Sequence, residues 1–328
     1  MTTGSDTPGV PRRTVLWAGL LASGCASGGG RAAPSEPPTP VRAATQATQA
    51  PLPHPPLWQP GPDELQPDVK RRAVELVAAL AAWPPGGQGV EAARARVAAL
   101  GLPPALADRA GGTLTDTAPE ASVEVVDAQY GGLLADSASV LVVCRRWTRG
   151  PDGSAVAGGT TVDVRLSRAE PRWTVTDLHP GAPGAAVPSP STAVARVLAE
   201  PRIELPPEAV ADLRSGAVHD SVAEAMLRLA GPYALSVSVV RSGHPLDVFG
   251  TTRPSDHPLG RAFDVWRIDG RAVVDRATPR TLIEAFMRDA AAAGSYNVGG
   301  PLAPAGGVGN QFFTDDTHHD HVHVGFDH

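Results

Sequence analysis

The chain has 328 residues, of which 42% are hydrophobic and 19% charged, and its formal net charge is −6 at pH 7. This length allows about two domains with buried cores once an N-terminal segment is set aside. The acidic balance and a pI near 5.9 exclude the uniformly basic surface of a nucleic-acid-binding protein, so no nucleic-acid partner is expected.

Residues 1–25 have the layout of an export signal. Arg12 and Arg13 supply a positive start, an apolar run follows from Val15, and small residues lead to Cys25. The apolar run is too short to cross a hydrocarbon core of about 30 Å as a helix.

Residues 21–25 also resemble a bacterial lipobox, and residues 12–16 resemble a twin-arginine signal. This resemblance implies a lipid on Cys25; a plain signal peptide and an uncleaved anchor are the alternatives. We therefore expect a protein that is exported to the cell envelope and held on the outer face of the membrane by its N-terminal lipid alone.

Residues 26–60 are rich in Pro, Ala, Thr and Gln and contain hardly any large apolar side chains. Such a segment cannot bury enough surface to offset its loss of conformational entropy. We expect a disordered linker here.

Residues 61–180 predict a smaller domain, in which helices precede an antiparallel sheet. Apolar residues recur at helical spacing over 63–82, which contains Lys70, the only lysine of the chain, and again over 90–100. Between residues 121 and 178 the period changes to two, as is typical of strands. The combination resembles the nuclear-transport-factor-2-like fold. No cluster of acids or histidines indicates chemistry, so we expect an accessory or binding role.

A Pro/Ala/Gly-rich linker over 181–193 leads to a second domain over 194–328. Its expected elements are, in chain order, helix 221–229, strands 235–240 and 262–268, a helix that begins near residue 279, and a last strand over 321–326. The predicted fold class is therefore α+β.

Two distant motifs in the second domain contain the residue types that a catalytic zinc ion needs. The first runs from Ser255 to Asp264, and the second covers residues 320–323. Zinc hydrolases commonly bind the ion through three N or O ligands and leave a fourth position for water. Side chains alternate along a strand, so Asp264 can face a cleft, while His321 and His323 share one face of the last strand. At least one of these two histidines should reach the metal.

Five of the ten histidines lie at or after His318, which would also fit a solvated metal-buffering tract or the remnant of a tag. The alternation of His with Val at strand spacing disfavours both. We expect His318 and His319 to orient the loop or to face water rather than to bind zinc.

The pattern Ser-x-His-x-x-Gly-x-Ala-x-Asp, followed by Asp-x-x-His, resembles that of zinc peptidases with the lysostaphin and Hedgehog type of fold. These include D-alanyl-D-alanine carboxypeptidases and dipeptidases and phage L-alanyl-D-glutamate endolysins. The resemblance covers roughly residues 235–326. It implies that His257, Asp264 and His323 bind Zn2+ and that Asp320 is the general base.

The spacing leaves the identity of the base open. Asp320 and His323 are an odd number of residues apart, so a regular strand would put them on opposite faces. Either Asp320 lies in a bend or bulge before the strand, or His321 is the base instead.

The chain also departs from the pattern upstream of the first motif. Many members of these families carry Ser-Gly-Tyr-Arg, whose arginine stabilises the oxyanion, whereas residues 242–245 here are Ser-Gly-His-Pro. Arg241, Arg253 and His244 are the candidates to replace that arginine, and loss of one oxyanion donor typically costs about 10²–10³ in rate. The resemblance implies that Ser255 contacts the substrate or supports a ligand.

The favoured hypothesis is an exported zinc metallopeptidase that hydrolyses D-amino-acid-containing amide bonds in peptidoglycan stem peptides. The alternative is a zinc-binding but catalytically inactive envelope lipoprotein that binds or senses a ligand. In a third hypothesis the histidines are incidental and the first domain carries the function of an envelope lipoprotein.

Overall fold

The computed structural model describes residues 50–328. The predictions of an export signal and of lipidation at Cys25 lie outside the described residues. Within residues 50–328, no helix combines the length and the apolar composition that a membrane crossing requires.

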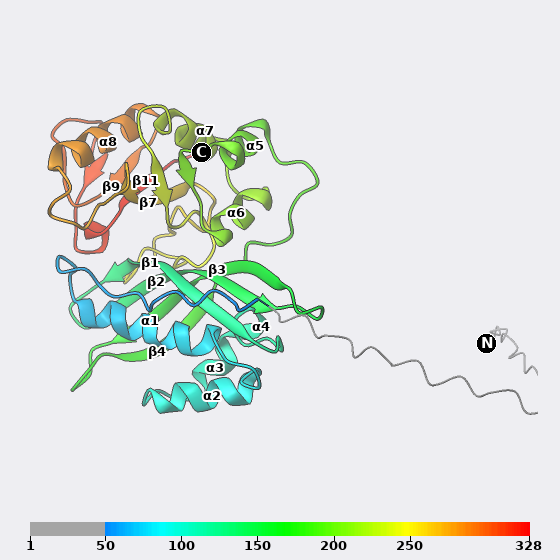
Figure 1. Ribbon diagram of the computed structural model, residues 1–328. Helices are drawn as coiled ribbons and strands as arrows, with labels where there is room; N and C mark the ends of the chain where they lie inside the picture. Colours follow the sequence, from blue (N-terminus) through cyan, green and yellow to red (C-terminus); the bar gives the residue numbers. More distant parts are fainter. Residues whose placement is uncertain (1–49) are drawn as a thin grey trace, which may run out of the picture. The chain divides into compact units, whose positions relative to one another are not determined.

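Residues 67–180 form short helices followed by a four-stranded sheet, as the change of hydrophobic period predicts (Figure 1). The helices are α1 (Pro67–Ala81), α2 (Val90–Ala99), α3 (Leu106–Arg109) and α4 (Gly111–Leu114). The strands are β1 (Ala121–Leu133), β2 (Ser137–Arg149), β3 (Ala155–Ser167) and β4 (Thr174–Pro180). Each strand pairs antiparallel with the next, in the order β1-β2-β3-β4.

Helix α1 covers one face of this sheet. Its apolar stripe includes Val69, Val77 and Leu80, each fully buried, and it packs in one cluster with Val140 of β2 and Val162 of β3. Burial of apolar surface, worth about 25 cal/mol per Å², therefore holds the helix to the sheet.

The last part of the predicted linker belongs to the folded body. Leu52 is only 2% exposed, the backbone carbonyl of Pro53 accepts a hydrogen bond from Ser122 Oγ, and Ala50 O accepts one from Arg149 Nη1 at 2.9 Å. The predicted linker boundary at residue 60 is thus too late, because Leu52 is buried and Trp58 packs against the core cluster of the first sheet.

Residues 192–328 form a second sheet with helices packed against it. The helices are α5 (Thr192–Ala199), α6 (Pro207–Arg214), α7 (Asp220–Leu229), α8 (Arg280–Ala292) and the 3-10 turn η1 (Thr317–His319). The strands are β5 (Ile203–Glu204), β6 (Leu235–Val237), β7 (Ala262–Ile268), β8 (Arg271–Ala272), β9 (Asn297–Gly299), β10 (Phe312–Phe313) and β11 (Val322–Gly325). The main strand order is β10-β9-β11-β7-β6-β5, and β8 pairs with β7.

Mixed helices and sheets confirm the α+β class. Strand β7 and helix α7 agree with the predicted ranges to within one residue. The predicted strand over 235–240 ends earlier, at Val237, and helices α5 and α6 were not predicted.

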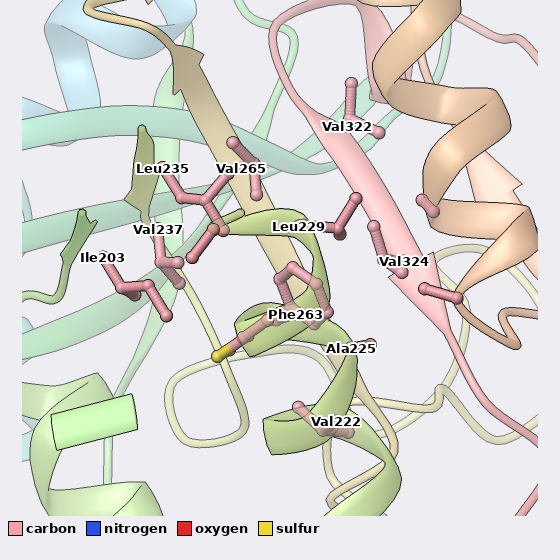
Figure 2. Packing of buried hydrophobic residues seen from close by; sticks show 14 of the residues in the cluster. Ile203, Val222, Ala225, Leu229, Leu235, Val237, Phe263, Val265, Val322 and Val324 are labelled. Atoms are coloured by element: carbon pink, nitrogen blue, oxygen red, sulfur yellow. The ribbon is translucent and has the colours of Figure 1, made fainter. Parts of the chain in front are cut away.

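The register between β7 and β11 decides which side chains face the core. The two strands are antiparallel, and His323 is the partner of Asp264. Phe263 of β7 and Val322 and Val324 of β11 are fully buried in the same apolar cluster as helix α7 (Figure 2). Because side chains alternate along a strand, Asp264 and His323 emerge together on the opposite face.

Glu208 of α6 is a buried carboxyl group whose titration should be visible in stability. It is 5% exposed, and its Oε1 has no hydrogen-bond partner among the described residues. Burial, and then the charge of Asp212, raises the pKa of Glu208 from 4.5 to about 7. Between these two values the folded protein keeps a proton that the unfolded chain has lost, so stability is full below about pH 4.5 and falls as pH rises through about 7.

Between pH 4.5 and 8 the free energy of unfolding of the wild type should fall because of Glu208. We predict that this fall is smaller by roughly 2–3 kcal/mol in Glu208→Gln. Urea unfolding at several pH values measures it, and Glu91→Gln, on the exposed surface of α2, is the control. Equal pH dependence in the wild type and both variants would contradict the prediction.

Candidate metal centre

His257 is placed by the loop that leads into β7. Gly260 has φ +73°, and a Cβ there would lie 1.9 Å from the carbonyl oxygen of Ala217, so only glycine fits this turn. His257 Nδ1 lies 2.8 Å from the carbonyl oxygen of Val240. A carbonyl only accepts hydrogen bonds, so Nδ1 carries the hydrogen and Nε2 keeps a free lone pair.

Two other potential metal-ligand atoms lie close to this nitrogen. His257 Nε2 lies 3.1 Å from Asp264 Oδ1 and 3.1 Å from His323 Nδ1, and the last two atoms are also 3.1 Å apart. A tetrahedral ion with bonds of about 2.0–2.2 Å separates its ligand atoms by about 3.3–3.6 Å. The triangle is therefore close to the size at which one cation contacts all three atoms.

The three groups are buried, with exposures of 1% for His257, 0% for Asp264 and 7% for His323. Burial alone would lower the pKa of His257, but the carboxylate of Asp264 outweighs it and raises that pKa. Burial raises the pKa of Asp264, yet its histidine neighbours hold it well below the usual range. Burial lowers the pKa of His323 to about 4, so this imidazole is neutral at pH 7 and has a lone pair to offer.

His244 joins the cluster from the side. Its ring stacks on that of His257, with centroids 4.1 Å apart and planes at 18°. Ligand atoms of His244, His257 and Asp264 all lie within 4.8 Å of one another, so this buried group could hold a metal ion. Burial lowers the pKa of His244 well below its usual value. Sequence reasoning had considered His244 only as a substitute for the missing arginine.

Asp320 does lie in a bend, with φ −105° and ψ −3°, just before β11. Its carboxylate nevertheless does not line the cavity beside the cluster: Oδ2 is 2.6 Å from Lys70 Nζ, and Oδ1 is 2.6 Å from His321 Nδ1. His321 Nε2 is 3.8 Å from Asp264 Oδ2, and His321 does line the cavity. Of the two predicted bases, the geometry favours His321.

The surrounding charges shift the pKa values of the two predicted bases in opposite directions. Burial raises the pKa of Asp320, but Lys70 and His321 outweigh it and lower the value to about 2. Burial lowers the pKa of His321, but Asp264 and Asp320 outweigh it and raise the value to about 8. Asp320 is therefore ionised at neutral pH, and its Oδ1 faces His321 Nδ1.

A cavity of about 1200 Å³ opens beside the cluster. The predicted residues that line it are His244, Arg253, Ser255, His257, His321 and His323. Arg241 lines only a neighbouring cavity of about 640 Å³, whereas His244 lines both cavities and Arg253 lines the larger one. Ser255 Oγ lies 3.4 Å from His244 Nδ1 and is only 5% exposed.

His318 and His319 of η1 each contact an acidic residue of the surrounding structure. His318 Nδ1 lies 2.7 Å from Asp315 Oδ1, and His319 Nε2 lies 3.0 Å from the carbonyl oxygen of Asp63. His318 also lines the cavity, with its ring centroid 5.2 Å from that of His321.

Sequence reasoning missed three groups from the first part of the chain. Gln129 Nε2 donates to Asp264 Oδ2 at 2.6 Å, the Tyr130 backbone N–H donates to Asp320 Oδ2 at 3.0 Å, and Lys70 pairs with the same oxygen. The only signal in the sequence is that Lys70 is the single lysine of the chain.

Comparison of the chain with family models, with curated proteins and with solved structures found no match. The resemblance to zinc peptidases therefore rests on the two motifs, and it remains a prediction. The geometry of the cluster stands independently of it.

We predict that the protein binds one divalent ion per chain, and that His257→Ala, Asp264→Ala and His323→Ala each weaken binding by more than about 100-fold, beyond the usual effect of losing an outer partner. His244→Ala should weaken binding by less than about tenfold, because its ring is stacked on His257 and is not part of the 3.1 Å triangle. Competition with a chelator measures the affinities. Equal losses for His244 and His323 would show that the triangle is the wrong ligand set.

Proposed function

We propose that the protein is a zinc metallopeptidase that hydrolyses D-amino-acid-containing amide bonds of peptidoglycan stem peptides, exported and held on the envelope by a lipid on Cys25. The observation that carries the proposal is the buried triangle of His257, Asp264 and His323, of which the two histidines line a large cavity. The motif resemblance supplies the reaction and the substrate class.

Zinc suits this donor set. Two imidazole nitrogens and one carboxylate oxygen are ordinary zinc ligands, and catalytic sites keep three protein ligands with one open position. His257 and His323 both line the cavity, so the open side of the triangle can face a substrate. When bound, zinc supplies Lewis acidity and makes water a stronger nucleophile near neutral pH.

His321 is assigned the proton transfers. Its Nδ1 faces the ionised Asp320, so in the neutral imidazole this nitrogen carries the hydrogen and Nε2 has the free lone pair. With a pKa of about 8, this neutral base form becomes the main one above that pH. In hydrolysis, Nε2 accepts a proton from the attacking water as the new C–O bond forms. It then delivers the proton to the amide nitrogen as the C–N bond breaks.

Arg253 is assigned the role of the missing arginine. His244 Nδ1 faces the carbonyl oxygen of Pro245 at 3.0 Å, so its hydrogen is on Nδ1, and Nε2 cannot donate to an oxyanion. Arg241 lines the other cavity. Arg253 is thus the remaining candidate cation on the wall of the cavity that adjoins the cluster.

We predict that His321→Ala lowers the rate of stem-peptide hydrolysis by about 10²–10⁴ while zinc content stays at that of the wild type, because a general base contributes a factor of this size and His321 is outside the triangle. Mass spectrometry of fragments released from purified peptidoglycan, together with zinc analysis of the same samples, tests this. Unchanged hydrolysis in both His321→Ala and Asp320→Ala would refute the proposed base.

Replacement of Arg253 should act on the chemical step. Arg253→Ala is expected to lower kcat by about 10²–10³, the usual effect of losing one oxyanion donor, with a smaller change in KM. Arg280→Ala, on the exposed surface of α8, is the matched control. A change confined to KM would instead assign Arg253 to substrate binding.

The second candidate function is a zinc-binding envelope protein that binds or senses stem peptides without turnover. The observation that favours it is Pro245, which stands where the related enzymes carry their catalytic arginine. Stoichiometric zinc without any released fragment would support this candidate over the peptidase. Absence of bound zinc would count against both.

A further inference from the structure

The first part of the chain reaches directly into the candidate metal centre. Strand β1 has irregular pairing between Val125 and Asp127 and again between Tyr130 and Gly132, so a short segment lies between two breaks in register. Such breaks re-aim side chains. Here they accompany Gln129 and the Tyr130 N–H, which contact Asp264 and Asp320 more than a hundred residues away in the sequence.

Both the nitrogen and the oxygen of the Gln129 side-chain amide make hydrogen bonds. It is fully buried, its Nε2 donates to Asp264 Oδ2 at 2.6 Å, and its Oε1 accepts a hydrogen bond from Ser238 Oγ. Asp264 thereby has one oxygen fixed by Gln129 and the other turned to His257 and His323. Without Gln129, a buried carboxylate oxygen would lose its 2.6 Å donor, and the carboxylate could rotate away from the triangle.

Lys70 performs the same task for Asp320. Its side chain is 1% exposed, and its ammonium group contacts both Asp320 and Glu64. A buried charge is costly unless it is paired, so the lysine and the two acids depend on one another. Because Lys70 and the Tyr130 N–H occupy Oδ2 of Asp320, Oδ1 is left for His321 Nδ1.

We propose that the part of the chain before residue 180 is a working component of the metal centre, in which Gln129 positions Asp264 and Lys70 positions His321 through Asp320. The role of Lys70 rests on the proposed peptidase function, whereas the role of Gln129 rests only on metal binding. Both are positioning residues, because neither lines the cavity.

The test of Gln129 needs no substrate. In the full-length protein, Gln129→Leu should lower the affinity for Zn2+ by about 10- to 100-fold and change the visible absorption spectrum of the Co2+-loaded protein, since outer partners of metal ligands have effects of this size. Ser139→Ala is the control: Ser139 is equally buried in the same sheet but bonds to Asp163. An affinity within twofold of the wild type, with an unchanged spectrum, would overturn this half of the proposal.

Replacing Lys70 alone would leave both Glu64 and Asp320 without their cation, so the test of Lys70 replaces Glu64 as well. The double variant Lys70→Met/Glu64→Gln should retain zinc and KM but lose at least about tenfold in kcat, whereas Glu64→Gln alone and Lys70→Arg should lose much less. At a pH at which the ring is neutral, nitrogen NMR of His321 should show a mixture of tautomers in the double variant and a single one in the wild type. Unchanged kcat and a single tautomer in the double variant would overturn the role of Lys70.

These outcomes separate the two proposals. If the wild type releases no peptide, the peptidase function fails, while the zinc affinity of Gln129→Leu and the tautomer of His321 still report on positioning. If the wild type hydrolyses stem peptides and the variants match it in rate, metal affinity and tautomer, only the positioning roles are wrong.

Discussion

The antiparallel pairing of β7 with β11 sets His323 opposite Asp264, and the rest of the candidate site is arranged around that pair. The same register buries Phe263 and Val324 against helix α7. A slip of one residue in this register would turn the side chains of the strand to the opposite face of the sheet. Val322 and Val324 would then leave the apolar core, and His323 would point into it. Packing of the core therefore determines which side chains of β7 and β11 reach the cluster.

Buried charge explains why the two parts of the chain meet at this place. Asp264, Asp320 and Lys70 are nearly inaccessible, and such groups are tolerated only when their charges and hydrogen bonds are satisfied. The second part cannot satisfy Asp320 alone, because two of its partners, Lys70 and the Tyr130 N–H, come from α1 and β1. The contact between the two parts and the outer layer of the candidate site are thus the same set of interactions.

Local patterns predicted the elements that carry the site. Alternation of apolar residues located β7 and placed Asp264 opposite the apolar cluster, but Asp264 is fully buried and does not line the cavity, so it does not face a cleft as expected. Strand parity left two alternatives, a bend at Asp320 or His321 as the base, and the structure contains the bend. The direction of that carboxylate could not be predicted, because it depends on Lys70, 250 residues earlier in the chain. The boundary before Leu52 was missed for a similar reason, since its burial depends on a sheet that composition does not reveal.

By itself, the sequence determined the α+β class, the faces of the strands and the pair of motifs that contain His257, Asp264 and His323. These follow from periodicity and spacing, which are local properties of the chain. Only the tertiary structure decided that His321, with Asp320 behind it, faces the cavity and that Gln129 supports Asp264. Those contacts join segments far apart in the sequence, and they form because buried polar groups must find partners wherever the fold brings them together.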